Sequence, residues 1–405
     1  MTGLSGLSDA GSSAASGAGV NLYPWDVVGD PACAERIAGL GADRVTLAAT
    51  YHTVRALTPR HPEHKVVTAA YSAVYYETDP RRWQGRRLQP VEAHWSQRSF
   101  TEAAPVLRAA GLSVYAWTVL AHNQRLGSIE PDCSVTSAYG DQYPWALCIS
   151  QPAVYQYCAT LVAEVAQQPN IDGIELEACG WYGFNHLHAH DKTGGIALDG
   201  AAELLLSLCF CGACLNSYRE HGINPAQLRG EVRKALDAVM AGESGPATAL
   251  DPELAAPVAR MRVAAADRMR GEAIAAVRAQ RSDLPVLVHT HPDPLAMGAN
   301  AGAVLETLYG ERGADGAILA CGVRSAAALA NVRQCAALAG PGQAVAATVS
   351  AVKGLGGRPD DLPAWCADLR DAGATELRFY HAGIASDADL AAVREAVATY
   401  SAPRG

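Results

Sequence analysis

The chain has 405 residues, of which 49% are hydrophobic, and its formal net charge is −9. This acidic balance, with no basic stripe to neutralise phosphates, argues against nucleic acid as a partner. No uncharged apolar run approaches the roughly 20 residues that cross a bilayer, so we expect no membrane span.

Residues 1–18 are expected to form a flexible tail, because Gly, Ser and Ala dominate them. They lack the basic and apolar regions of a secretory signal peptide. We therefore predict a cytoplasmic protein, in which the eleven cysteines are reduced thiols or metal ligands rather than disulfides. Residues 19–405 are predicted to form a single domain.

From residue 19 onward, short β-branched runs alternate with amphipathic segments rich in Ala and Leu, a pattern typical of parallel βα units. The expected strands are Val20–Trp25, Arg44–Ala49, Ser113–Leu120, Ile171–Leu176, Pro285–His289, Ala317–Ala320, Ala344–Val349 and Glu376–Tyr380. The expected helices are Pro31–Leu40, Phe100–Ala110, Gln151–Gln168, Cys214–Arg281, Ala301–Arg312, Ser325–Leu338, Pro359–Ala372 and Asp387–Tyr400. Eight such units predict an α/β fold, the (β/α)8 TIM barrel, with a doubly wound open sheet as the alternative.

Long βα loops interrupt this alternation. We expect loop excursions at 57–98 and 121–150 and a helical insertion at 215–283, after the fourth strand. Within the first excursion, the run VVTAAYSAVYYE at 66–77 is expected to form an accessory hairpin. Within the insertion, Pro252–Arg281 is amphipathic and longer than a barrel needs, so it is a candidate interface of a homo-oligomer; the alternative is a solvated insertion packed on the barrel wall.

The fourth expected strand ends in two carboxylates. Alternate side chains of a strand face the same way, so Glu175 and Glu177 project to one side, where a carboxylate pair can act as acid and base. We predict Glu177 as the general acid, and Glu175 as a deeper group that raises the pKa of Glu177 by like-charge proximity. A second catalytic carboxylate is expected from Asp293, Asp26 or Glu77, in that order. The alternative is that these glutamates form structural ion pairs.

Barrel active sites are built from the loops after the strands. Those loops are rich here in aromatic, His, Asp and Glu side chains, which suit a sugar: aromatic faces stack on pyranose rings, and imidazoles and carboxylates bind hydroxyls. The sequence therefore predicts a carbohydrate or glycoconjugate ligand. The candidate substrate-binding residues are Trp25, Trp117 and Trp181 as stacking platforms, with Asp26, Tyr51, His122, His186, His289, His291 and Tyr380 as polar contacts.

A second hypothesis uses the His-x-His pair after the fifth strand. His289 and His291, followed by Asp293, could be ligands of a catalytic metal in a barrel hydrolase or isomerase, with one position open for water.

Three cysteines within six residues, Cys209, Cys211 and Cys214, predict a site for a soft metal, because thiolates this dense in a reducing compartment are usually held by zinc or iron–sulfur. The residues leave the fourth ligand open. Cys148 is a candidate, and the rival candidates are Cys133, Cys158 and Cys179.

Two segments, Leu147-Cys148-Ile149-Ser150-Gln151-Pro152 and Cys209-Phe210-Cys211-Gly212-Ala213-Cys214, together resemble the zinc-cluster β-galactosidases of glycoside hydrolase family 42 and the hypothetical glycoside hydrolases around them. The resemblance covers roughly residues 145–220. It implies an O-glycosyl hydrolase barrel with its acid/base glutamate at Glu177. It also implies one structural zinc bound by Cys148, Cys209, Cys211 and Cys214.

The chain departs from that family at two places. Leu176-Glu177 stands where the family has an Asn-Glu pair, and the seventh strand region, TVSAVKG, has no carboxylate where the family has its nucleophile. The segment Asp172–Glu177 is also similar to the DGxDxDxE strand of chitinase-like barrels, but the final glutamate of that motif falls on Cys179. A carbohydrate-binding barrel without catalysis is therefore a third hypothesis.

Overall fold

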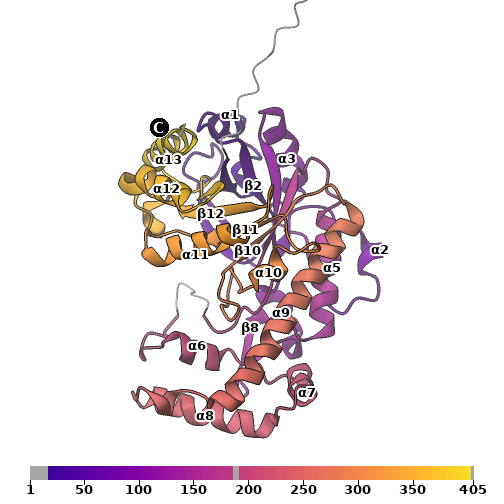
Figure 1. Ribbon diagram of the computed structural model, residues 1–405. Coiled ribbons are helices and arrows are strands. Elements are labelled where there is room, and N and C mark those ends of the chain that lie inside the picture. Colours follow the sequence, from indigo (N-terminus) through magenta and orange to yellow (C-terminus); the bar gives the residue numbers. More distant parts are fainter. Residues whose placement is uncertain (1–16, 186–190, 403–405) are drawn as a thin grey trace, which may run out of the picture.

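The computed structural model describes residues 17–185 and 191–402. Eight parallel strands close into a barrel, because β1 pairs with both β2 and β13. The strands are β1 (Ala18–Leu22), β2 (Arg44–Tyr51), β6 (Ser113–Val119), β9 (Gly173–Glu177), β10 (Val286–Thr290), β11 (Gly316–Ala320), β12 (Ala344–Ser350) and β13 (Glu376–Tyr380). The predicted (β/α)8 TIM barrel is thus confirmed, and each of the eight expected strands has its counterpart (Figure 1).

Helices surround this barrel on the outside (Figure 1). Those at the expected places are α1 (Cys33–Ala38), α3 (Ser99–Ala109), α5 (Pro152–Val165), α11 (Ala326–Leu338), α12 (Leu362–Asp371) and α13 (Asp387–Ser401). The helix expected at 301–312 is reduced to the single turn of α10 (Leu305–Leu308). The residues before it form a loop instead, in which Gly302 forms a bridge with His291.

The excursion after β2 differs from the expected hairpin. Its first part, β4 (Val66–Ala69), pairs antiparallel with β3 (Val54–Leu57), whereas β5 (Ala73–Val74) adds to the edge of β2. The run at 66–77 therefore does not fold on itself, because each half finds its partner upstream. The short α2 (Pro80–Trp83) follows, and the excursion after β6 contains α4 (Gln124–Ile129), β7 (Ser134–Thr136) and β8 (Gln142–Leu147).

Between β9 and β10 the described residues form α6 (Gly200–Leu206), α7 (Gly212–Glu220), α8 (Pro225–Met240) and α9 (Pro252–Gln280). Figure 1 shows α6, α7 and α8 below the barrel, with α9 running from them up along its side. The carboxylate of Asp251 caps α9 by accepting the amide hydrogen of Glu253, and Pro252 begins the helix, where a proline costs no hydrogen bond. Among the described residues, no helix is both long and apolar enough to cross a membrane.

The interior of the barrel holds large side chains from several strands. Tyr115, Leu287, Ile318 and Ala346 form a cluster separate from the main core. Two glycines make room for the interior: a Cβ at Gly173 would lie 2.2 Å from the Tyr115 ring, and one at Gly19 would lie 3.1 Å from Cδ of Arg378. A charged side chain, Arg378, is thereby accommodated in the centre of the fold, next to the strand that carries Glu175.

Candidate active site

The end of β9 places both predicted glutamates against β6. In the parallel register Trp117 is opposite Glu175, and Val119 is opposite Glu177. Both carboxylates are buried: Glu175 is 0% exposed and Glu177 is 7% exposed. The two-residue spacing puts the side chains on the inner side of the strand, and their different neighbours shift the pKa values of the two carboxyls in opposite directions.

Glu175 is held as an anion. Its Oε1 accepts a 2.8 Å hydrogen bond from Nε of Arg378, and its Oε2 lies 3.6 Å from Nε2 of His289. Burial alone would raise the pKa of this carboxyl, but the Arg378 and His289 side chains outweigh it and lower the pKa to about 2. Arg378 is shared with a second carboxylate, Glu376, also at 2.8 Å. Glu175 is therefore a charged part of the barrel core and not a proton donor.

Glu177 has the opposite tendency. Burial raises its pKa above the usual range, and the charge of Glu175 adds to the increase. The imidazole of His289 and the indole of Trp117 oppose this shift, the indole through a 2.7 Å hydrogen bond from Nε1 to Oε2. A raised pKa extends the pH range over which the carboxyl keeps its proton, which is the form a general acid needs.

Aromatic rings surround this carboxyl. Tyr51 packs edge-on to Trp117 with ring centroids 4.7 Å apart, and Tyr380 packs edge-on to Trp117 at 6.1 Å. The hydroxyls of Tyr51 and Tyr380 lie 3.4 Å apart, and the charge of Glu177 contributes to the raised pKa of both tyrosines. The strands β2, β6, β9 and β13 thus bring three of the predicted binding residues together around Glu177.

Three residues of this cluster were not among the predicted site residues. Tyr23 stacks on His381 at 4.2 Å and packs on Tyr51 at 5.0 Å. Tyr182, in the segment after β9, stacks on His122 at 4.3 Å, and the charge of Glu177 contributes to its raised pKa. Each lies in a segment that follows a barrel strand, and this position is the sequence signal that could have identified all three as site residues.

Of the remaining predicted binding residues, Trp25 is buried against Tyr23 and Tyr75, and His122 also packs on His52. Trp181 lies beneath α9: its indole donates to the carbonyl of Arg262 at 2.9 Å, and the guanidinium of Arg262 covers its ring. This contact leaves no open face for a sugar on that side. His186 lies outside the described residues.

The candidates for a second carboxylate lie in three different surroundings. Glu77 is exposed, with Oε2 3.8 Å from a guanidinium nitrogen of Arg98. Asp26 is buried, accepts the amide hydrogen of Tyr23 at 2.8 Å, and has its pKa raised to about 7 by burial. Asp293 is exposed in the loop after β10, where its Oδ1 accepts the amide hydrogen of Leu295.

Of the three candidates, Asp293 is the one whose loop, within the described residues, is hydrogen-bonded to the segment that follows Glu177. The amide of Gly298 donates to the carbonyl of Trp181, and the carbonyl of Ala299 accepts from Ala178. This backbone pairing keeps the loop beside the end of β9.

The two histidines after the fifth strand point to different partners. His289 approaches Glu175, whereas both ring nitrogens of His291 are used outside the barrel interior: Nδ1 accepts the amide hydrogen of Asp293 at 3.0 Å, and Nε2 lies 3.0 Å from the amide nitrogen of Asn331 on α11. Within residues 17–185 and 191–402, His289, His291 and Asp293 do not form a cluster with metal-ligand spacing. The His-x-His hypothesis therefore has no geometric support there.

The four cysteines Cys148, Cys209, Cys211 and Cys214 do form such a cluster, with their sulfurs all within 4.8 Å of one another, and all four are buried. Cys148 comes from the segment after β8, Cys209 and Cys211 lie just before α7, and Cys214 lies in its first turn. The Sγ of Cys209 accepts an amide hydrogen from Thr136 at 3.3 Å. Four soft donors that converge in this way suit a tetrahedral ion such as Zn²⁺, with no position left open.

The rival fourth ligands lie elsewhere. Cys133 accepts the amide hydrogen of Cys148 through its carbonyl, and its thiol is not part of the cluster. Cys158 lies on α5 and Cys179 follows β9. Cys148, the ligand implied by the resemblance, is the one that joins the triplet.

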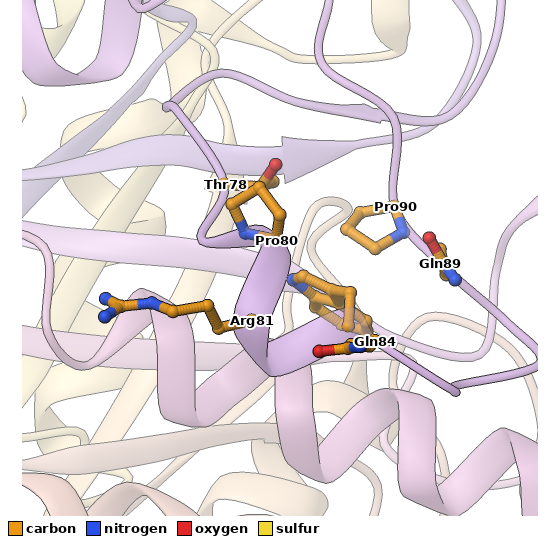
Figure 2. Close-up of a pocket in the computed structure, with 7 residues that line it drawn as sticks. Thr78, Pro80, Arg81, Gln84, Gln89 and Pro90 are labelled. Carbon is orange, nitrogen blue, oxygen red and sulfur yellow. The ribbon is translucent and has the colours of Figure 1, made fainter.

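A surface hollow of about 400 Å³ lies outside this region (Figure 2). Its lining comes entirely from the excursion after β2, and none of the predicted site residues contributes to it. The lining residues are Thr78, Pro80, Arg81, Trp83, Gln84, Gln89 and Pro90.

No family model and no curated protein matches the chain in sequence. Solved structures do match it. The glycoside hydrolase domain of PgaB (BpsB) from Bordetella bronchiseptica is 17% identical, with a TM-score of 0.57 over 94% of this chain and 98% of its own. A β-galactosidase from the Antarctic haloarchaeon Halorubrum lacusprofundi is 11% identical, with a TM-score of 0.55 over 96% and 58% of the two chains. The endo-1,4-β-mannanase of Rhizomucor miehei is 10% identical, with a TM-score of 0.50 over 94% and 93%.

These likenesses establish the barrel fold of the chain. The described structure adds to that fold a buried pair of glutamates at the end of β9 and a separate buried cluster of four cysteines.

Proposed function

We propose that the protein is a glycoside hydrolase, or an enzyme derived from one, that cleaves a sugar or glycoconjugate with Glu177 as general acid. One observation carries this proposal: the carboxyl of Glu177 is buried among aromatic rings at the carboxyl end of the barrel strands, with its pKa raised by that burial. The structural neighbours named as glycoside hydrolases agree with this reading of the fold.

The proposed proton transfer uses the contacts of Glu177. Its proton passes to the glycosidic oxygen as the bond from that oxygen to the anomeric carbon breaks, which leaves Glu177 as a carboxylate. The indole of Trp117 and the imidazole of His289 both favour this charged form, so they stabilise the product of the transfer. Burial keeps the proton in place beforehand.

We propose Asp293 as the second carboxylate, because its loop is paired with the segment after Glu177. In a bound complex, a separation of about 5–5.5 Å between the two carboxyl groups would give retention of configuration, and about 6.5–9.5 Å would give inversion. Glu175 does not take this role, because Arg378 and His289 already engage it.

We propose a structural role for the four cysteines. They would hold one Zn²⁺ in a closed site that pins the start of α7 to the segment after β8. The protein would be cytoplasmic, where such thiols stay reduced.

A panel of aryl glycosides and oligosaccharides tests the proposed activity. Wild-type protein should release product from at least one sugar class, Glu177→Gln should not, and Glu102→Gln, an exposed glutamate on α3, should behave as wild type. A panel in which wild type and Glu177→Gln are equally inactive would contradict it.

The second candidate function is carbohydrate binding without turnover. One observation favours it. Glu175 is the carboxylate that acts on the pKa of Glu177, and because Arg378 already pairs with it, it does not serve as the second catalytic carboxylate. Calorimetric binding of a sugar, equal in wild type and Glu177→Gln and without turnover in either, would support this function over hydrolysis.

A further inference from the structure

Arg262 is a buried cation of α9 whose guanidinium contacts the residue two before the cysteine triplet. Its side chain is 2% exposed. Its guanidinium lies 4.4 Å from the centroid of the Trp181 ring, and its Nη1 donates to the carbonyl of Ser207 at 3.3 Å. Ser207 precedes the metal-type triplet by two residues, so the guanidinium lies where α9 meets the start of that triplet.

Among the described residues, two other arginines are buried to a similar degree, and both have carboxylate partners. Arg378 lies 2.8 Å from Glu175 and 2.8 Å from Glu376. Arg270, two helical turns after Arg262 on α9, lies 2.6 Å from Asp267. Burying a charge without a partner costs several kcal/mol, so this pairing is the expected arrangement.

Arg262 departs from that arrangement. Within the part of the chain that the structure describes, it forms no ion pair with a carboxylate, and its Nε and Nη2 have no hydrogen-bond partner. Burial lowers its pKa, and the groups that oppose this effect are Tyr218, Cys214, Cys209 and Cys148. Three of these four are members of the cysteine cluster, so its thiols are candidate partners for the unpaired guanidinium of Arg262.

A metal would create that anion. Four thiolates carry four negative charges and a divalent cation carries two positive charges, so a loaded site has a net charge of about −2. Four protonated thiols have none. A buried guanidinium beside the cluster is therefore favourable when the metal is bound and unfavourable when the site is empty.

We propose that Arg262 is the counter-cation of the anionic site that forms when the four cysteines hold a divalent metal, and that it positions Trp181 according to whether the metal is bound. This inference rests on the metal site proposed above. It adds a role for Arg262 that the ligands alone do not require. Because the same guanidinium covers Trp181, whose carbonyl accepts from Gly298, metal binding is linked to the pairing of the two loops beside Glu177.

Zinc affinity measured by competition with a chromophoric chelator tests the proposal. Arg262→Met should weaken Zn²⁺ binding about 10- to 100-fold, the usual effect of losing a partner beyond the ligands. Arg268→Met is the matched control, because Arg268 lies on the same helix and also covers a ring, that of Tyr155 at 4.3 Å, but is exposed. Equal affinity of wild type and Arg262→Met would overturn the proposal.

A stability comparison separates charge compensation from simple packing. With Zn²⁺ bound, Arg262→Met should lower the melting temperature; after the metal is removed by chelation under reducing conditions, the same substitution should raise it or leave it unchanged. A purely structural arginine would lower it in both states, and that result would overturn the proposal. If chelation unfolds wild type, Arg262→Lys in the competition assay decides: affinity nearer wild type than that of Arg262→Met supports the role of charge, and affinity equal to that of Arg262→Met contradicts it.

Metal analysis of wild-type protein separates a failure of the proposed metal site from a failure of the proposed role of Arg262. No bound metal after purification with Zn²⁺ would rule out the metal site itself. One bound metal with unchanged affinity in Arg262→Met would rule out only the role of Arg262.

Discussion

Nε of Arg378, on the last barrel strand, lies 2.8 Å from Oε1 of Glu175, on the fourth. This contact separates the roles of two glutamates that are only two residues apart. Glu175 is fixed as an anion in the core, whereas burial raises the pKa of Glu177 above it. A deep ion pair and a carboxyl with a raised pKa on one strand are the physical basis of the proposed activity.

Removing one member of the deep pair should strongly destabilise the fold. We expect Arg378→Met to lower the free energy of unfolding by about 3–5 kcal/mol, because Glu175 would be left as a buried, uncompensated charge. Urea denaturation measures this. Arg98→Met, which disrupts the exposed pair with Glu77, should leave the midpoint nearly unchanged. Equal midpoints for Arg378→Met and wild type would show that the pair contributes little.

The pH dependence of activity should follow the protonation of Glu177. Its raised pKa means that activity persists below that pKa and falls as the pH rises through it. The Trp117 hydrogen bond stabilises the charged form, so Trp117→Phe should raise the pKa further and move the basic limb of kcat/KM to higher pH. A limb that stays in place, or moves to lower pH, would contradict the assignment.

Asp26 should make the protein less stable as the pH rises toward neutral. Burial raises the pKa of Asp26 to about 7, above its unfolded value of 3.8. Between these two values the folded state holds a proton that the unfolded state has lost, so stability falls with rising pH, by about 1.4 kcal/mol for each unit of difference.

Asp26→Asn, which cannot ionise, should therefore be more stable than wild type at pH 8 and similar to it at pH 4. Urea denaturation at both pH values provides the comparison. A difference between the two proteins that does not change with pH would rule out this explanation.

The cysteine cluster should bind one equivalent of zinc. Cys148→Ser should reduce the metal content and lower the melting temperature, because a closed site loses one of four ligands. Cys158→Ser, buried on α5 and outside the cluster, should keep the full equivalent. Elemental analysis of the purified variants checks this, and full metal content in Cys148→Ser would refute the ligand set.

The sequence predicted the barrel because strands buried on both faces appear as short apolar runs, and such runs are local. The strand β1, which is buried throughout, is one example. The pairing of β4 was missed because it is not local in this sense. Val66–Ala69 pairs with β3, and the path of the excursion determines this partner, whereas the pattern of apolar residues within 66–77 does not.

The glutamate pair and the cysteine triplet could be predicted because each lies within a few residues of sequence. Their partners could not. Arg378 meets Glu175 across 203 residues, and only the closure of the barrel brings them together. The position of Trp181 depends in the same way on the path of α9, which places Arg262 over its ring.

The central claim is tested most directly by the loss of kcat/KM that Glu177→Gln causes on two substrates with different leaving groups. If Glu177 donates the proton to the leaving oxygen, kcat/KM for a glycoside with a poor leaving group should fall about 10²- to 10⁴-fold. A 2,4-dinitrophenyl glycoside of the same sugar, whose leaving group needs no proton, should lose far less. Equal losses on the two substrates, or no loss on either, would contradict the assignment of Glu177 as the acid.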